Sequence, residues 1–353
     1  RIVPSKAPLP ILSGLLIRTT DDHHVEIIAN DMELSIRCLV DAQVIEPGSI
    51  VLPARFFGEI VRRLPDGTIH LKVNGPAFIA EIQGERLEME LNGMDPMDFP
   101  SAPQVDQLNP WVVEQGKLRR AIGQVDFAIS TDESRPAMTG ALLRMAPGDC
   151  SIVAMDGFRF AERKMDTPAT EGRECIIPGK TLNDLVKLLN DDDTPVNILI
   201  GSNHITFSFE RVTLSSRLIE AQFPFKRAAD LIRVEPTTII RSSVKNLSEG
   251  IDRALLVTRD SATSSNIVRL QFSDSTLTIS SNSPDVGRLN EVIAVAQEGD
   301  ELLIGFNGRY LNDILKAVGS DEIECRFSGP LKAAVFVPVG ESSFISILSP
   351  IRI

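Results

Sequence analysis

The feature of this sequence that most constrains its fold is a segment that occurs three times at nearly equal spacing. The copies cover residues 54–64, 179–190 and 307–318, and corresponding positions lie 125 and then 129 residues apart. Internal repetition of this kind indicates one structural unit built several times. The 353-residue chain therefore predicts three similar domains in succession.

Each copy carries a basic, an acidic and a basic residue at positions i, i+4 and i+7. In a helix of 3.6 residues per turn these positions share one face. A single face of this kind is typical of a solvent-exposed surface with ion pairs along it, whereas three copies indicate one surface built three times. The triplets are Arg55/Glu59/Arg62, Lys180/Asp184/Lys187 and Arg309/Asp313/Lys316.

A second amphipathic helix also repeats, over residues 117–129 and 243–254. Its counterpart in the first domain would precede residue 1, so we expect an initial strand and helix to be missing from that domain. The segments between the helices alternate in polarity or are rich in β-branched residues, which predicts strands. These strand segments are residues 25–37, 150–164, 205–218 and 268–280.

The pattern predicts an α+β fold in which each domain packs two helices on antiparallel sheets. We place the domains at residues 1–107, 108–233 and 234–353. No apolar run is long enough for a membrane span, and the first ten residues do not resemble a signal peptide.

The sequence offers no set of residues for catalysis, a metal or another cofactor. The four cysteines and four histidines show no zinc spacing, and we expect reduced thiols. Gly179-Lys180-Thr181 suggests a phosphate-binding loop, but Glu174 stands where that motif needs glycine. A catalytic alternative would use Asp31 and Asp156, which occupy equivalent repeat positions; a role in turns explains both more simply.

Several short motifs occur along the chain in a specific order and spacing. They are Leu9-Pro10-Ile11-Leu12, Asn30-Asp31-Met32-Glu33, residues 153–161, Gln222-Phe223-Pro224, Gly305-Phe306-Asn307 with Tyr310, and Ser349-Pro350-Ile351-Arg352-Ile353. Together they resemble the bacterial DNA sliding clamp, the beta subunit of the replicative DNA polymerase III, and the resemblance covers the chain from residue 6 onward. It implies a six-domain ring formed by a head-to-tail homodimer, which encircles duplex DNA, slides without base readout and has no enzymatic activity.

The resemblance implies that basic residues of the lining helices contact DNA phosphates, in a salt-sensitive way. The chain has a net charge of −12, which by itself argues against DNA binding. However, the five helical segments hold twelve basic and six acidic residues, a net of +6, which leaves −18 for the remainder. The implied DNA contacts are Lys6, Arg55, Arg62, Arg63, Lys117, Arg119, Arg120, Lys180, Lys187, Lys245, Arg253, Arg309 and Lys316.

The resemblance also implies a hydrophobic cleft between the second and third domains. Such a cleft receives short linear peptides of DNA polymerase, the clamp loader and repair proteins. The apolar members of the set have an alternative role in the core. The implied cleft residues are Arg135, Met138, Met155, Gly157, Phe158, Arg159, Phe160, Pro224, Asn307, Tyr310, Leu331, Ile347, Leu348, Ser349, Pro350, Ile351 and Arg352.

Matching positions place Leu256 and Val257 at the dimer contact, where the alternative is a role in the core at a helix end. The implied location is the cytoplasm, in association with the nucleoid. A second hypothesis is a diverged, clamp-like scaffold that binds proteins but no longer encircles DNA. It is motivated by the missing start and by the altered cleft residues Phe158, Phe160 and Ser349.

Overall fold

The computed structural model describes residues 3, 9–103, 109–167, 172–258 and 266–353, with the side chains at 227–229 and 231 left aside. The chain divides into two compact units, which we describe separately. Unit 1 is Arg1–Gln115 with Asp192–Leu218, and unit 2 is Gly116–Asp191 with Ile219–Ile353. The α-helices of the described residues are α1 (Ala54–Val61), α2 (Gln115–Gly123), α3 (Gly179–Val186), α4 (Phe225–Ile232), α5 (Val244–Thr258) and α6 (Gly308–Ala317).

Unit 1 is built on an eight-stranded sheet in which all neighbouring strands run antiparallel. The sheet joins two four-stranded halves where β3 pairs with β15. Segments far apart in the sequence thus form one continuous sheet. In sheet order the strands are β4 (Ser49–Pro53), β1 (Gly14–Asp21), β2 (His24–Asn30), β3 (Leu34–Asp41), β15 (Val212–Arg217), β14 (His204–Phe209), β13 (Pro195–Ile200) and β8 (Trp111–Glu114).

A second, three-stranded sheet completes unit 1. It consists of β5 (His70–Asn74), β6 (Ile79–Gly84) and β7 (Leu87–Asn92), in that order. Buried apolar side chains of the large sheet and of β6 form one core cluster, and Phe57 of α1 packs against it. Burial of these side chains is the main favourable term that holds the helix and the two sheets together.

Unit 2 contains a nine-stranded antiparallel sheet with the same organisation. Its two halves meet where β11 pairs with β24, from Arg159 opposite Leu348 to Arg163 opposite Phe344. In sheet order the strands are β12 (Arg173–Pro178), β9 (Gly140–Met145), β10 (Cys150–Met155), β11 (Arg159–Met165), β24 (Phe344–Leu348), β23 (Ala334–Pro338), β22 (Glu322–Phe327), β16 (Thr238–Ser243) and β20 (Ala296–Gly299).

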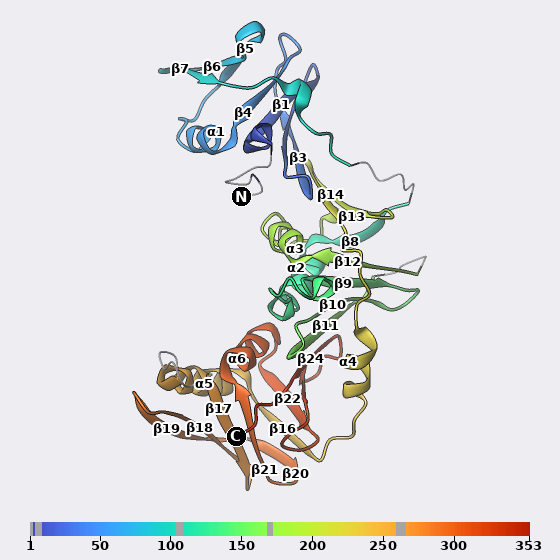
Figure 1. Cartoon of the computed structure of the whole chain (residues 1–353), viewed down its shortest axis with the longest axis vertical. Helices are drawn as coiled ribbons and strands as arrows, with labels where there is room; N and C mark the ends of the chain where they lie inside the picture. The colour runs from blue at the N-terminus through green and yellow to red at the C-terminus, as the bar shows by residue number, and fades with distance from the viewer. Residues whose placement is uncertain (1–2, 4–8, 104–108, 168–171, 259–265) are drawn as a thin grey trace. The chain divides into compact units, whose positions relative to one another are not determined.

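The four-stranded sheet of unit 2 has the order β19 (Gly287–Ala294), β18 (Thr276–Ser283), β17 (Ile267–Ser273) and β21 (Leu302–Asn307). Helices α5 and α6 lie side by side, and α5 packs against β18 and β19 (Figure 1). Leu247, Ile251 and Ala254 recur at helical spacing and are buried, so they form the apolar stripe of α5.

The structure contains all five helices predicted from the sequence, although their ends differ. The first three were expected to run further than they do. After α2, for example, the chain leaves the helix at Gly123 and forms a separate 3₁₀ turn over Asp126–Ala128. Helix α4 was not predicted from the sequence.

Each strand segment predicted as one run is a hairpin of two strands. Residues 150–164 form β10 and β11, and the turn between them begins at Asp156. The same arrangement occurs at residues 25–37, where Asp31 accepts hydrogen bonds from the backbone of Glu33 and Leu34. Equivalent aspartates in successive repeats thus shape equivalent turns, the role expected for them in the sequence analysis.

Candidate functional site

The turn between β10 and β11 of unit 2 sets the geometry of the candidate site. Asp156 Oδ1 accepts hydrogen bonds from the backbone N–H groups of Phe158 and Arg159, both at 2.8 Å. Gly157 has φ +94°, a conformation that costs glycine little and other residues more. A Cβ at this position would lie 2.7 Å from Nη1 of Arg135. The turn therefore has a fixed shape that depends on both the aspartate and the glycine.

Arg159 connects this turn to α6. Its Nε donates to Asp156 Oδ2 at 3.0 Å, and its Nη1 donates to Asp313 Oδ2 at 2.6 Å. The guanidinium carbon lies 4.0 Å from the centroid of the Tyr310 ring and 5.5 Å from that of Phe127. The Arg159 side chain is only 10% exposed, so these contacts are made largely out of water. A charge with two carboxylate partners and two aromatic faces holds β11 firmly against α6.

An exposed aromatic surface lies directly above this ion network. Phe158 is 58% exposed, and its ring centroid lies 6.4 Å from that of Tyr310. The N–H of Ser349 donates to the carbonyl of Phe158 at 2.9 Å, which continues the β11–β24 pairing beyond Leu348. Asn307 caps α6, because its side chain accepts from the N–H groups of the first helical turn.

Other predicted cleft residues belong to the core. Phe160 and Ile347 are buried in one apolar cluster, and Met155 packs against it. Leu348 is fully buried. The core alternative considered for the apolar residues thus describes Phe160, Ile347 and Leu348.

The remaining cleft residues are more scattered. Met138 follows Arg135, and its N–H donates to the Arg135 carbonyl at 2.9 Å. Ile351 bridges to Gly305. Four predicted residues make no hydrogen bond or ring contact with the group around Arg159 within the part of the chain that the structure describes. They are Leu331 on the β22–β23 connection, Pro224 before α4, and Pro350 and Arg352 after β24.

The described members of the predicted DNA set are all exposed, and they lie on or next to helices of both units. Three lie on or just after α1 in unit 1, and the others lie on or next to α2, α3, α5 and α6 in unit 2. Lys6 lies outside the described residues. Of the two dimer residues, Leu256 is 64% exposed in the last turn of α5 and Val257 is half-buried.

Arg253 is held by two acidic partners. Its Nε and Nη2 bond to Glu291 of β19 at 2.8 and 2.6 Å, and Glu249 lies 3.8 Å away. The hydrogen bond from Arg253 lowers the pKa of Glu291 despite partial burial. Arg253 is therefore less available to a phosphate than its sequence position suggests.

Near Arg159, the environment of the Asp126 carboxyl disfavours its ionised form. Burial raises its pKa above the usual value, the N–H of Phe127 opposes this, and the negative charge of Asp313 adds to the increase. Two thiols are also affected, since burial raises the pKa of both Cys175 and Cys325 to about 12. These cysteines are protonated at neutral pH and therefore poor nucleophiles.

Several of these partners were missed in the sequence analysis. Asp313 was recognised only as the acid of its triplet, and Glu291 was not singled out. The spacing of three positions from Asp156 to Arg159 could have indicated a turn closed by its own aspartate. The described residues contain no group of three or more acidic, His or Cys side chains suited to a metal. No described helix is long and apolar enough to cross a membrane.

Comparison with known proteins decides the family. The DNA polymerase III beta subunit models match the chain in three parts: the N-terminal domain at residues 1–103, the central domain at 112–225 and the C-terminal domain at 230–352. The beta sliding clamp of Staphylococcus aureus is 33% identical over 365 residues, which cover 100% of this chain and 94% of the relative. This chain belongs to the bacterial beta sliding clamp family.

Further clamps agree with this assignment. The Bacillus subtilis beta sliding clamp is 32% identical over 364 residues, covering 100% of this chain and 95% of the relative. The B. subtilis clamp structure has a TM-score of 0.93 at 32% identity, with 99% of this chain and 94% of that chain covered. A Pseudomonas aeruginosa clamp bound to griselimycin has a TM-score of 0.92 at 26% identity, with 100% and 94% covered.

Family membership confirms the α+β fold of three clamp domains predicted from the sequence. The chain is a DNA polymerase processivity factor and not an enzyme. The alternative of a scaffold that has lost the clamp function is not favoured.

Proposed function

We propose that two copies of this chain close head to tail into a ring around duplex DNA. The observation that carries this proposal is the arrangement of strands at the sheet edges. Inside the chain, β3 pairs with β15 and joins two four-stranded sets into one sheet, and β11 pairs with β24 and joins a four-stranded set to a five-stranded one. The sets containing β3, β11 and β19 share one strand order, with these strands at corresponding ends.

Two described strands, β19 and β7, lack the second neighbour that the equivalent strands at the internal junctions have. Among the described strands, β19 pairs only with β18, and β7 pairs only with β6. Edge strands expose backbone donors and acceptors that readily pair with another chain. If β19 of one copy pairs with β7 of the next, the third junction repeats the two internal ones. Two three-domain chains then close without a free end of this kind.

The predicted dimer residues agree with this placement. Leu256 lies on α5, the helix that packs against β19, and it is exposed. We retain the domain limits 1–107, 108–233 and 234–353 as part of this proposal. With these limits, each junction joins one sheet half from each of two neighbouring domains.

Within such a ring, the exposed basic side chains on the helices contact phosphates without reading bases. The five helical segments carry a net charge of +6, whereas the rest of the chain carries −18. The positively charged helical segments therefore attract DNA over a long range, whereas the acidic remainder of the chain repels it. Retention comes from ring closure, so tight contacts are not needed, and the site of action is the nucleoid of the cytoplasm.

We further propose that the aromatic surface of Phe158 and Tyr310 receives short peptides of polymerase, clamp-loader and repair proteins. Exposed Phe158 and half-buried Tyr310, next to the ion network of Arg159, offer an apolar contact with fixed polar neighbours, the usual composition of a peptide-binding hot spot. Gly157 and Ser349 border this surface, since Gly157 precedes Phe158 in the turn and Ser349 donates to the Phe158 carbonyl.

The dimer is tested by sedimentation of the chain and its Leu256→Asp variant. We expect the wild-type chain to sediment at twice the chain mass and Leu256→Asp to shift it to the monomer, because the charge would have to be buried at the contact. Leu303→Asp is the matched control, since Leu303 is also exposed but lies on β21. A monomeric wild-type chain, or equal effects of both variants, would contradict the proposed closure.

A further inference from the structure

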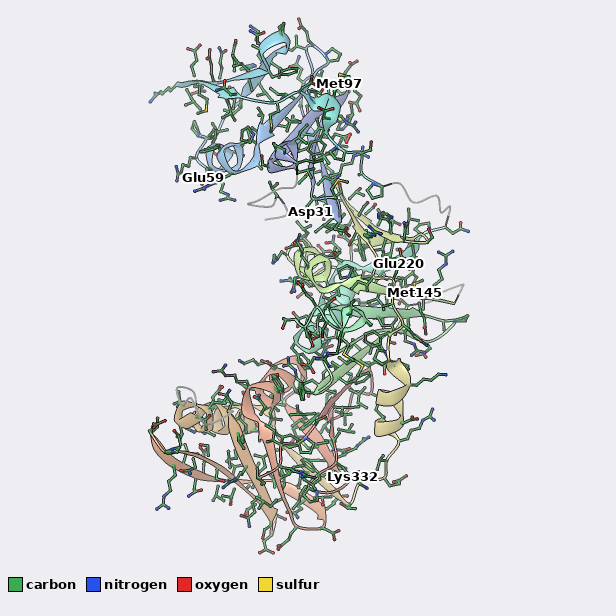
Figure 2. The ribbon with its side chains drawn as sticks, in the orientation of Figure 1. Asp31, Glu59, Met97, Met145, Glu220 and Lys332 are labelled. Carbon is green, nitrogen blue, oxygen red and sulfur yellow. The ribbon has the colours of Figure 1, made fainter. Side chains whose placement is uncertain are left out.

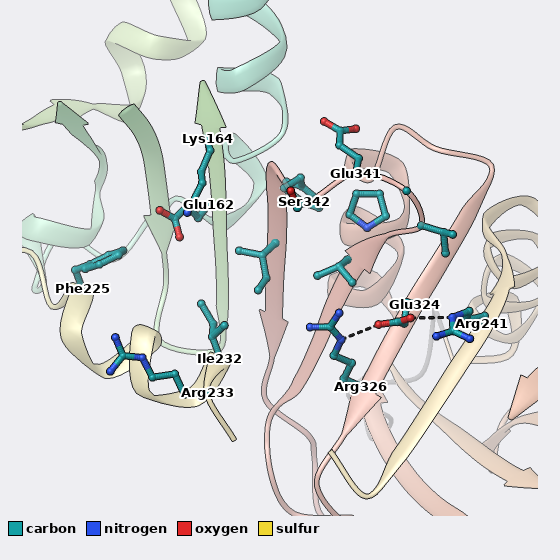
Figure 3. A pocket seen from close by; sticks show the side chains of 16 residues that line it. Glu162, Lys164, Phe225, Ile232, Arg233, Arg241, Glu324, Arg326, Glu341 and Ser342 are labelled. Carbon is teal, nitrogen blue, oxygen red and sulfur yellow. Dashed lines mark hydrogen bonds and ion pairs between the residues drawn. The ribbon is translucent and has the colours of Figure 1, made fainter. Parts of the chain in front are cut away.

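A cavity of about 730 Å³ lies on the nine-stranded sheet of unit 2, next to α4 (Figure 3). Strands β11, β16, β22, β23 and β24 and the β23–β24 connection contribute to its lining. Among the described residues, none of those assigned above to DNA, to partner peptides or to the dimer lines it. Its volume is in the range of pockets that bind drug-sized molecules.

One side of the cavity is apolar and rests on a well-packed part of the core. The ring centroid of Phe225 lies 6.4 Å from that of buried Phe160. The Arg144 guanidinium lies 4.2 Å from the Phe225 centroid and also forms an ion pair with Glu162. This wall is therefore fixed in place and suited to an aliphatic or aromatic group. Its apolar residues are Phe225, Ile232, Val337, Phe344 and Ile345.

Two of the three acidic side chains in the lining, Glu324 and Glu341, are hydrogen-bonded to arginines, and the third, Glu162, lies 3.8 Å from Arg144. Glu324 accepts from Arg241 at 2.8 Å and from Arg326 at 2.7 Å (Figure 3). Burial acts to raise the pKa of Glu324, but these two hydrogen bonds outweigh it and lower the pKa. Glu341 accepts from Arg163 in the same way. The carboxylates are thus neutralised from within the protein.

Two basic side chains in the lining, Lys164 and Arg233, have no acidic partner as close as those of Arg241 and Arg326 among the described residues. Lys164 approaches Asp149 at only 3.8 Å. Arg233, which follows α4, makes no hydrogen bond or ion pair with any residue that the structure describes. An excess of positive charge beside an apolar wall is notable in a chain whose net charge is −12.

We propose that this cavity binds a short acidic segment of a partner protein, with one carboxylate at Lys164, a second at Arg233 and the apolar side chain between these two acids against the Phe225 wall. Guanidinium and ammonium groups bind carboxylates through strong, charge-assisted hydrogen bonds. Apolar burial supplies the remaining affinity. This inference does not depend on ring closure or on DNA binding.

The test is calorimetric titration of the full chain with the peptide acetyl-Asp-Phe-Glu-amide and with its neutral analogue acetyl-Asn-Phe-Gln-amide. We expect the acidic peptide to bind at least tenfold more tightly. Arg233→Glu and Lys164→Glu should each weaken it by about tenfold or more, since each replaces attraction with repulsion. Val339→Trp, at an exposed position in the lining, should block binding by filling the cavity.

Lys332→Glu is the matched control, because it makes the same charge change on the β22–β23 connection without lining the cavity (Figure 2). It should bind the peptide as the wild-type chain does. The proposal is wrong if the acidic peptide does not bind, if both peptides bind equally, or if the cavity variants behave like Lys332→Glu.

Discussion

The repeated basic–acidic–basic helix behaves differently in its first and third copies. In α1, Glu59 lies 3.6 Å from Arg55 within the same exposed helix face (Figure 2). In α6, the equivalent acid, Asp313, bonds at 2.6 Å to Arg159 of β11 instead. In the second copy the acid also pairs locally, because Asp184 of α3 lies 2.8 Å from Lys187, the residue after the helix.

The difference shows that one sequence pattern serves two physical purposes. Arg55 is 85% exposed, so its ion pair is screened by water, whereas Arg159 is 10% exposed and its contacts are not. Because Asp313 is engaged by β11, Arg309 and Lys316 of α6 have no ion pair among the described residues. The third copy thus joins two parts of unit 2 and leaves its own bases available to phosphates.

The largest effect is expected from Arg159→Ala. It leaves Asp156 and Asp313 without their partner, so we expect the free energy of unfolding of unit 2 to fall by about 3 kcal/mol. The chain has one tyrosine, Tyr310 in unit 2, and one tryptophan, Trp111 in unit 1. In urea unfolding, the transition followed by the near-ultraviolet signal of Tyr310 should therefore move to a lower urea concentration. The transition followed by the fluorescence of Trp111 should stay where it is.

Arg55→Ala is the matched control for that experiment. Removal of an exposed pair should change the unfolding free energy by less than about 0.5 kcal/mol. Equal losses in the two variants would remove the distinction between the copies.

A smaller loss is expected from Asp313→Asn. The Asp313 side chain is 41% exposed, and Arg159 keeps its bond to Asp156, so we expect a loss of about 1 kcal/mol. The same change should lower the pKa of Asp126 toward its usual value, because a repelling charge is removed. Nuclear magnetic resonance titration of the Asp126 carboxyl measures this shift, and an unchanged pKa would contradict the coupling.

The smallest effect is a gain in stability from Asp126→Asn. The pKa of Asp126 is raised in the folded chain, so ionisation opposes folding at neutral pH. Removing that charge should stabilise unit 2 by less than about 1 kcal/mol at pH 7, since the carboxyl is only part-buried. The gain should disappear below about pH 4, where the unfolded carboxyl is also protonated. Melting curves at both pH values test the sign.

The repeat predicted much of the fold. It indicated three equivalent helices, and in the second of these, α3, the face away from the charged triplet buries Leu182 and Leu185. Local patterns could not show which strands meet across the chain, such as β11 with β24, because that pairing depends on packing between distant segments. The helix α4 lacked a repeat partner and was missed for that reason.

The candidate site was predictable only in part. The cleft set came from a resemblance, and Phe158, Arg159 and Tyr310 do lie together. The link from Arg159 to Asp313 spans 154 positions, and no spacing rule predicts such a contact. Burial of Leu348 also follows from the sheet around it rather than from its own sequence context.

The most direct test of ring closure is retention on DNA of different topology. The chain is loaded by a clamp loader onto a nicked circular duplex, washed in high salt, and the circle is then cut once. We predict that the protein stays on the intact circle and is released after linearisation, because only topology holds it once salt has weakened the phosphate contacts. Equal retention on circular and cut DNA would contradict the account.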